Sequence, residues 1–404
     1  MDNRIVSDGE TISTITKKSA WTEDQHHEMP CMKKLLSPFL LSLSITGCYS
    51  FTDMNKNVDR KRVIKSTISR TYRMLVLLAI TLYLAKCIAA FFYISKTLVL
   101  FNGLVVVWLC CIVATFLVFL KASSIKYGHI EEAFIFWQKN IIPEFNEMEI
   151  KFPTSSMRRK IMVVAVVAWI VVVLNMTGTG VQIYFGGPEL LTSPFGGSPA
   201  TITVAMIVSF YASCVWVFPT FFVVMISKLL YETIHSYNKF SSVHCTKEGC
   251  HMADDIQRVR LLHANLCKLV NDLDGDLSWF YASSFTFSIG IAVFTLYQIM
   301  KTDLSTYELI LFLFWFCSQL AIATMLAIYA AFVNDEAHAP LDTIYHINVK
   351  DITLEKLTQL NLYLSKLTGT QVGFTVCGLL VITKEFILTI SGVFLTYFAV
   401  LYTL

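Results

Sequence analysis

Charged residues are scarce in this sequence. Asp, Glu, Lys and Arg make up 15% of its 404 residues and hydrophobic residues make up 55%, against ~25% and ~45–50% in an ordinary soluble protein. A soluble domain of this length could not cover so much apolar surface with so few charges, which argues against a cytosolic enzyme. The net charge of +3 gives no excess of one sign that would indicate nucleic acid. Lipid is the expected solvent for most of the chain.

Catalytic motifs are also missing. The sequence contains no phosphate-binding loop, no nucleophile with its base and no paired carboxylates, so we expect no enzyme. His244, Cys245, Cys250 and His251 offer four possible zinc ligands in one loop without a second cluster, and a plain loop is favoured over a metal site. We therefore predict no metal and no cofactor.

Long apolar stretches, by contrast, are abundant. Seven approach or exceed the ~20 residues that a helix needs to cross a hydrocarbon core of ~30 Å. They are residues 74–95, 99–120, 161–185, 200–227, 277–300, 307–333 and 385–404. The predicted fold class is all-α, a polytopic membrane protein with seven transmembrane helices. Pro219 should kink the fourth span, and the shorter stretch 35–51, which contains proline, serine and glycine, is expected to be interfacial or re-entrant.

Basic residues are distributed unevenly between the spans. Lys and Arg number 23 in segments 51–73, 121–160, 228–276 and 334–372, but 2 in the connections 96–98, 188–198 and 301–305. Because basic residues near span ends stay on the cytoplasmic side, the N-terminus is expected in the cytoplasm and the C-terminus outside. The first thirty residues show no signal-peptide pattern, so the first span should direct insertion. A G-protein-coupled receptor has the opposite orientation and is disfavoured.

The eleven cysteines do not indicate a disulfide framework in this orientation. Five lie inside predicted spans, and four lie on the reducing side. The first group is Cys87, Cys110, Cys111, Cys214 and Cys317, and the second is Cys31, Cys245, Cys250 and Cys267. We predict no structural disulfide.

Two cytoplasmic segments show helical periodicity, with apolar residues at steps of three and four. The first series is Val259, Leu262, Leu266, Leu269 and Leu273, and the second is Leu357, Leu360, Leu364 and Leu367. Such stripes require an apolar cover. They either pack on each other beneath the membrane or form an anchor between subunits.

The C-terminal residues resemble a known family. The run 373–379 reads Gly-Phe-Thr-Val-Cys-Gly-Leu, and Thr396-Tyr397 is followed by five apolar residues, which is similar to the C-terminal signature of arthropod gustatory receptors. Residues 334–337, Asn-Asp-Glu-Ala, are also similar to that family. The family typically ends its last span in Gln-Phe, whereas this chain has Thr403-Leu404. The resemblance implies a tetrameric, ligand-gated, non-selective cation channel whose seventh helices line one pore and whose subunits each hold a ligand pocket in the outer half.

The last span carries small and hydroxylated residues on one helical face. These candidate pore-lining residues are Thr389, Gly392, Thr396, Ala399 and Thr403. Around a shared axis, hydroxyls could hydrate a passing cation while apolar rings form the gate. The alternative is that small residues merely let helices approach closely.

The outer halves of the spans hold a set of polar and aromatic side chains suited to a small polar or amphipathic ligand. The candidate ligand-binding residues are Asn175, Gln182, Tyr184, Ser209, Tyr211, Tyr297, Gln298, Glu308, Trp315 and Gln319. Each could instead be an interfacial anchor or a tie between helices. Glu308 is the only acidic candidate, so an aromatic or weakly polar tastant fits better than a sugar held by several carboxylates.

The chain is thus expected to comprise three regions. Residues 1–73 form a cytoplasmic N-terminal segment, 74–333 a six-helix transmembrane domain with cytoplasmic helical extensions, and 334–404 an anchor helix and the pore helix. The expected partners are a small-molecule tastant, membrane lipid and other gustatory receptors in a homo- or hetero-tetramer at the plasma membrane of chemosensory neurons. A subunit that needs a co-receptor is the first alternative. A transporter is less favoured, because no internal repeat is detected.

Overall fold

The computed structural model describes residues 31–49, 60–93, 96–123, 130–186, 192–246, 252–345, 353–369 and 371–403. These residues are nearly all helical, which confirms the all-α prediction. Six helices are long and apolar enough to cross a membrane within this described part. They are α3 (Arg60–Ala90), α4 (Lys96–Ala122), α7 (Thr154–Gly186), α9 (Pro199–Thr246), α10 (Met252–Lys301) and α11 (Thr306–His338). Each contains most of one of the first six predicted spans, and α14 (Lys384–Thr403) contains most of the seventh.

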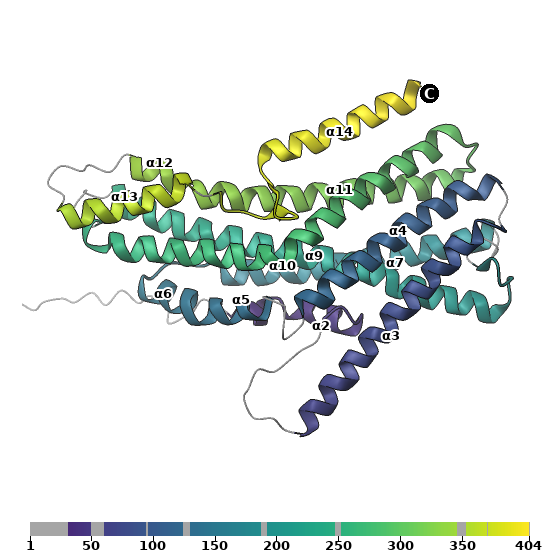
Figure 1. Ribbon diagram of the computed structural model, residues 1–404, viewed down its shortest axis with the longest axis horizontal. Helices are drawn as coiled ribbons and strands as arrows, with labels where there is room; N and C mark the ends of the chain where they lie inside the picture. Colours follow the sequence, from purple (N-terminus) through teal and green to yellow (C-terminus); the bar gives the residue numbers. More distant parts are fainter. Residues whose placement is uncertain are drawn as a thin grey trace, which may run out of the picture.

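The helices form an elongated bundle (Figure 1). Their short connections lie at one end of the long axis, and α12 (Pro340–Tyr345) and α13 (Leu354–Gly369) lie at the other. Helices α9 and α10 have 48 and 50 residues, about 72–75 Å at ~1.5 Å per residue. They therefore extend far beyond a hydrocarbon core of ~30 Å, and α9 continues through Pro219.

Helix α9 is the centre of the bundle. Its most apolar window is 83% buried, against 28–50% for the other five long helices. Phe218 and Phe222 are fully buried, and the ring of Phe119 from α4 meets Phe222 edge-on at 6.0 Å and Phe280 of α10 at 5.7 Å. Such edge-to-face pairs add stabilisation beyond area burial. The core that positions the rest of the molecule is therefore aromatic and built around α9.

The segment predicted as interfacial forms two short helices, α1 (Met32–Leu35) and α2 (Ser37–Ile45). Helix α2 begins with Pro38 in its first turn, a position where the missing N–H costs little, and buries Phe39, Leu40 and Leu43 completely. The packing of α2 against α9 attaches the N-terminal segment to the core, while its depth relative to a membrane stays a prediction.

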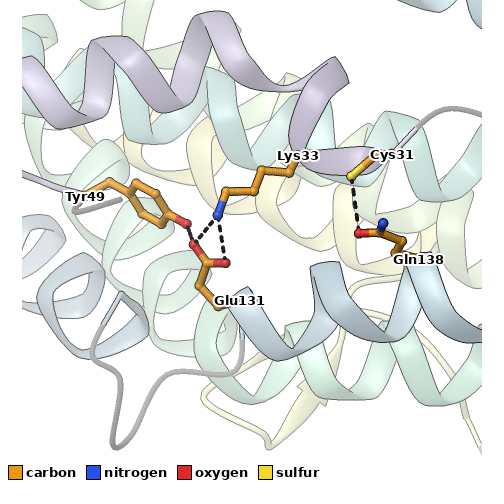
Figure 2. Close-up of polar contacts among 5 residues, drawn as sticks. All are labelled: Cys31, Lys33, Tyr49, Glu131 and Gln138. Carbon is orange, nitrogen blue, oxygen red and sulfur yellow. Dashed lines mark hydrogen bonds and ion pairs between the residues drawn. The ribbon is translucent and has the colours of Figure 1, made fainter. Parts of the chain in front are cut away.

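Polar contacts also attach this N-terminal segment to α5 (Ile130–Phe136), as Figure 2 shows. Glu131 accepts hydrogen bonds from Lys33 Nζ at 3.1 Å and from the Tyr49 hydroxyl. Burial, with the adjacent Glu131 carboxylate, raises the pKa of Tyr49, so its hydroxyl stays a donor. Cys31 Sγ lies 3.9 Å from Gln138 Oε1 in the π-helical turn η1 (Trp137–Ile141), which continues into α6 (Ile142–Glu147).

The first leucine stripe is covered by the chain itself. It lies on α10, which runs without a break from this stripe into the fifth span, and its five residues are at most 2% exposed. Leu360 and Leu367 of the second stripe are buried on α13, which packs against α10. The two helices that carry the stripes thus pack on each other within the described residues, while their position beneath a membrane and any anchoring between copies stay predictions.

A small β-hairpin joins α13 to α14. Strand β1 (Thr375–Val376) pairs antiparallel with β2 (Leu380–Val381), with Thr375 opposite Val381. Three residues, Cys377, Gly378 and Leu379, connect the strands. Cys377 and Gly378 have positive φ, 53° and 71°, as the central residues of a type I′ turn do, and the Leu379 N–H donates to the Val376 carbonyl at 3.0 Å. The sequence run 373–379 thus folds into this hairpin, which the span predictions did not include.

Candidate functional site

A pocket lies among α3, α4, α7, α9, α10 and α11, at the end of the bundle where the short connections lie. The volume within which the centre of a water-sized sphere can move is ≈ 70 Å³. This is several times the ~10–15 Å³ that a cavity needs to hold one water molecule. Its walls are mainly apolar and aromatic, with a few amides and hydroxyls. They comprise Tyr83, Phe101, Leu104, Val105, Trp108, Asn175, Thr179, Gln182, Ser209, Trp216, Ile291, Trp315 and Gln319.

Asn175 of α7 organises the polar part of this pocket. Its Nδ2 donates to Ser213 Oγ of α9 at 2.7 Å, and its Oδ1 accepts from Trp315 Nε1 of α11 at 3.0 Å. Ser213 in turn donates to the Ser209 carbonyl at 2.7 Å. This buried network connects three helices and fixes the orientation of the Trp315 ring.

Two glutamines add further polar groups to the walls. Gln319 Oε1 accepts from Ser288 Oγ of α10 at 3.2 Å. Gln182 Oε1 is buried and has no hydrogen-bond partner among the described residues. An unpaired buried acceptor costs about 1–3 kcal/mol, so a ligand hydroxyl or amine that reaches Gln182 would gain a partner already present in the wall.

Aromatic rings cluster around Trp315 at the pocket. Phe101 of α4 lies 6.0 Å from Trp315 and 5.9 Å from Phe312, centroid to centroid. A ring placed among these residues would meet edges and faces at ordinary aromatic spacing. The pocket therefore suits a small, mostly apolar or aromatic molecule with one or two hydrogen-bonding groups.

Five of the ten candidate ligand residues line this pocket. They are Asn175, Gln182, Ser209, Trp315 and Gln319. The other five, Tyr184, Tyr211, Tyr297, Gln298 and Glu308, are not among its lining residues.

The five residues outside the pocket have other surroundings. Tyr184 is 82% exposed, the Tyr211 hydroxyl accepts from Tyr72 at 3.3 Å, and Tyr297 is half-buried on α10. Gln298 is buried near the end of α10, where its Oε1 accepts from Thr302. Glu308 caps α11, because its Oε2 accepts from the Ser305 backbone N–H at 2.9 Å.

The sequence prediction missed the wall that α3 and α4 supply. Tyr83, Phe101 and Trp108 lie in the first two spans, whereas all ten predicted ligand residues lie in the third to sixth spans. One signal was available: Trp108 and Trp216 lie in the middle of apolar stretches, away from the interfaces where tryptophan is enriched.

The candidate pore residues lie together on α14, and Figure 1 shows this helix leaning away from the bundle. Thr389, Gly392, Thr396, Ala399 and Thr403 are all exposed. The hydroxyls of Thr389 and Thr396 donate to carbonyls of their own helix at 3.0 and 2.9 Å. Only the first turns of α14 pack on the bundle, where Phe386 meets Phe285 of α10 at 5.3 Å. Most of this apolar helix is left uncovered by the described part of the chain.

The hairpin before α14 is held by α10 through Asp274. Its Oδ1 accepts from the Thr375 backbone N–H at 2.7 Å and its Oδ2 from the Thr375 hydroxyl at 2.7 Å. The Cys377 N–H also donates to the Ser278 carbonyl at 3.2 Å. Because hydrogen bonds to charged groups are the stronger ones, this pair fixes β1 on α10.

Helix α11 holds the other side of the hairpin. Asn334 Nδ2 donates to the Val372 carbonyl at 2.9 Å, and Asp335 forms an ion pair with Lys384 at 2.7 Å. A Cβ at Gly373 would lie 3.1 Å from both the Asn334 side chain and Val381, so glycine permits this close approach. The helices that line the pocket, α10 and α11, therefore also hold the base of α14.

The described cysteines are all free, and the described residues contain no cluster of potential metal ligands. The side chains of the possible zinc ligands His244, Cys245, Cys250 and His251 lie outside the described residues.

Comparisons with known proteins give one family and one fold. Residues 36–402 match the family model of the 7tm chemosensory receptors. The insect olfactory receptor OR5 from Machilis hrabei in complex with eugenol is similar in structure, with a TM-score of 0.65 and 15% identity over 92% of this chain and 98% of that one. A second structure of the olfactory receptor OR5 from Machilis hrabei gives a TM-score of 0.61 and 13% identity over 91% of this chain and 97% of that one. No curated protein sequence matches the chain.

Proposed function

The chain belongs to the 7tm chemosensory receptor family, and on this basis we propose that it is a gustatory receptor that acts as a ligand-gated, non-selective cation channel. The observation that carries the proposal is the pocket around Asn175, enclosed by six helices and mixed in polarity. The family membership makes it a multi-pass membrane chemoreceptor. The resemblance of residues 373–397 to gustatory receptors supports taste over smell, at the plasma membrane of a chemosensory neuron.

The proposed pore consists of α14 helices from four copies around one axis. Its support is the contrast between the apolar composition of α14 and its exposure in one subunit. Placed around an axis, Thr389, Thr396 and Thr403 would present hydroxyls to a hydrated cation. Homomeric and heteromeric assemblies both satisfy this geometry.

The proposed coupling runs along two helices. Ile291 and Gln319 line the pocket, whereas Asp274 and Asn334 on the same helices hold the hairpin. The separations are about 25 Å along α10 and about 22 Å along α11, at ~1.5 Å per residue. A ligand that prefers one arrangement of α10 against α11 would shift the hairpin and α14 with it, in proportion to that preference.

The proposed ligand is a small aromatic or weakly polar compound that can donate a hydrogen bond. The rings of Phe101 and Trp315 favour its apolar body, and the unpartnered Gln182 Oε1 favours a donor. The structurally similar olfactory receptor OR5 is in complex with eugenol, which supports a pocket of this kind. None of the described residues that line the pocket is acidic, so a polyhydroxylated sugar is a poorer fit.

The test is whole-cell current from cells that express this chain alone, with G-protein signalling blocked, during application of aromatic, bitter, sugar and amino-acid compounds. A fast cation current would support a self-sufficient channel. Trp315→Phe removes the Nε1 donor to Asn175, and Trp169→Phe is the matched control on the outer face of α7, where Trp169 packs on Phe218. We expect Trp315→Phe to weaken sensitivity about tenfold and Trp169→Phe to leave it unchanged. Equal shifts in both variants would place the ligand elsewhere.

A heteromeric receptor is the second candidate, because Thr403-Leu404 replaces the Gln-Phe pair that gustatory receptors typically carry. Silence from the chain alone, followed by current on co-expression with another receptor of the family, would favour it. Stoichiometric uptake of the ligand without current would instead favour a transporter.

A further inference from the structure

A second hollow lies between α7, α9 and α11, on the opposite half of the bundle from the ligand pocket. The volume within which the centre of a water-sized sphere can move is ≈ 400 Å³ here, against ≈ 70 Å³ in the ligand pocket. Its walls are mainly apolar, and three basic side chains lie at its mouth. The lining residues are Arg159, Lys160, Val163, Val164, Phe221, Val224, Met225, Lys228, Met325 and Tyr329. We refer to this hollow as the basic groove.

The basic groove lies at one boundary of the apolar stretches. Lys160 immediately precedes the stretch 161–185, and Lys228 immediately follows the stretch 200–227. Val163 at the groove is 56% exposed, and the neighbouring Val166 and Ile170 on α7 are 55% and 51% exposed. Such an apolar face belongs in lipid, so the groove opens sideways to hydrocarbon at the level where headgroups begin.

The charges at the mouth are only partly neutralised. Lys160 and Lys228 share one carboxylate, Glu232, at 3.1 and 3.7 Å, and Lys228 also lies 4.9 Å from the ring centroid of Tyr329. Arg159 is exposed and forms no ion pair within the described residues. Three cations and one carboxylate leave a net positive mouth, with a guanidinium that suits bidentate contact to phosphate.

We propose that the basic groove binds an anionic phospholipid, with the headgroup phosphate at Arg159 and Lys228 and one acyl chain along Val163, Val224 and Met325. A cation at a membrane boundary attracts anionic headgroups. The apolar walls offer a surface for an acyl chain, which a soluble anion lacks. Both requirements are met on the same three helices. A lipid in this groove would fill the hollow that α7, α9 and α11 line.

The test measures thermal unfolding of the purified full-length chain in neutral detergent against added lipid. The probes are phosphatidylserine, phosphatidylcholine and water-soluble glycerophosphoserine. We expect phosphatidylserine to raise the unfolding temperature at lower concentration than phosphatidylcholine, and glycerophosphoserine to have no effect. An equal effect of glycerophosphoserine would identify a free-anion site, and a shift that grows with protein concentration would identify a second copy of the chain; either result overturns the proposal.

Three variants locate the effect. Arg159→Gln should raise the phosphatidylserine concentration at half effect about fivefold. Val163→Trp keeps every charge but fills the exposed edge of the groove, and should reduce the response to phosphatidylserine and phosphatidylcholine alike. Arg158→Gln is the matched control, because it removes the same charge from the adjacent residue, which does not line the groove. It should leave the response to phosphatidylserine unchanged. If Arg158→Gln and Arg159→Gln have equal effects, the attraction is diffuse and the basic groove is not a site.

Discussion

Helices α9 and α14 are both strongly apolar, yet α9 is buried inside the bundle and α14 is largely exposed. The most apolar window of α9 is 83% buried inside its own chain. On α14, by contrast, Leu388 and Leu395 are 73% and 69% exposed. Hydropathy therefore does not distinguish a helix that forms the core of a subunit from one that the subunit leaves uncovered. What separates them is the neighbours that cover them within this chain: other helices cover α9, whereas the exposed face of α14 is the surface that the proposed pore would cover.

The strongest test of this contrast truncates an aromatic ring in α9. Phe222→Ala removes a fully buried ring that contacts Phe119, and the cavity should cost about 3–5 kcal/mol of unfolding free energy. The measurement is the yield and thermal stability of the receptor in detergent. Phe398→Ala on the exposed part of α14 is the matched control and should leave subunit folding within about 0.5 kcal/mol. Comparable losses would mean that α14 is packed within the subunit after all.

Much of this architecture follows from sequence patterns that depend on local composition. The span predictions succeed because runs such as 99–120 contain no charge, and the first leucine stripe is buried because its spacing matches one helical face. That stripe and the fifth span lie on one continuous helix, α10. Asp274 and Asp276 resemble loop residues, but each binds a neighbouring segment, Asp274 to Thr375 and Asp276 to the Ile130 N–H at 3.1 Å, so α10 continues through them.

The sequence predicted only part of the pocket lining. Asn175, Gln182 and Gln319 attract notice because polar groups in an apolar span need partners. Tyr83 and Phe101 carry no such signal, since an aromatic residue in a span is ordinary until the fold places it beside Trp315. The hairpin was also hidden, because strands of two residues leave no periodic pattern and depend on the positive φ at Cys377 and Gly378.

The second prediction concerns permeation. Thr396→Phe places a large ring on the candidate pore face of α14, and we expect it to abolish ligand-gated current while surface expression stays normal. Leu395→Phe, on the adjacent face, should leave the current largely intact. Surface biotinylation and whole-cell recording measure both. Normal current in Thr396→Phe would remove this stripe from the pore.

The third prediction weakens the link between the two regions. Thr375→Val removes the hydroxyl that donates to Asp274 and keeps the side-chain shape, a loss of about 1.5–3 kcal/mol for a charged hydrogen bond. Ligand binding, followed as a thermal shift, should persist, while the maximal current falls about tenfold. Thr358→Val on α13, whose hydroxyl bonds only its own helix, is the control. A parallel loss of binding would show that Thr375 supports the pocket rather than the link.

The smallest prediction applies one substitution to both helices. Ser227 on α9 is fully buried, donates to the Val223 carbonyl at 2.9 Å and lies 2.8 Å from the Tyr281 hydroxyl. Ser391 on α14 donates to the Ile387 carbonyl at 2.9 Å and is exposed. Both therefore satisfy a local helical bond, but within the part of the chain that the structure describes only Ser227 has a partner on another helix.

Replacing each serine by alanine isolates that partner. Ser227→Ala leaves the buried Tyr281 hydroxyl without this contact and should cost about 1–3 kcal/mol of unfolding free energy. Ser391→Ala should change stability by less than about 0.5 kcal/mol, because helix propensity rises slightly and no neighbour loses a bond. Thermal unfolding of the two variants in the same detergent measures the difference. A larger cost of Ser391→Ala in an assembled receptor than in dissociated subunits would mean that Ser391 has a polar partner on another copy, as the proposed pore of α14 helices would allow.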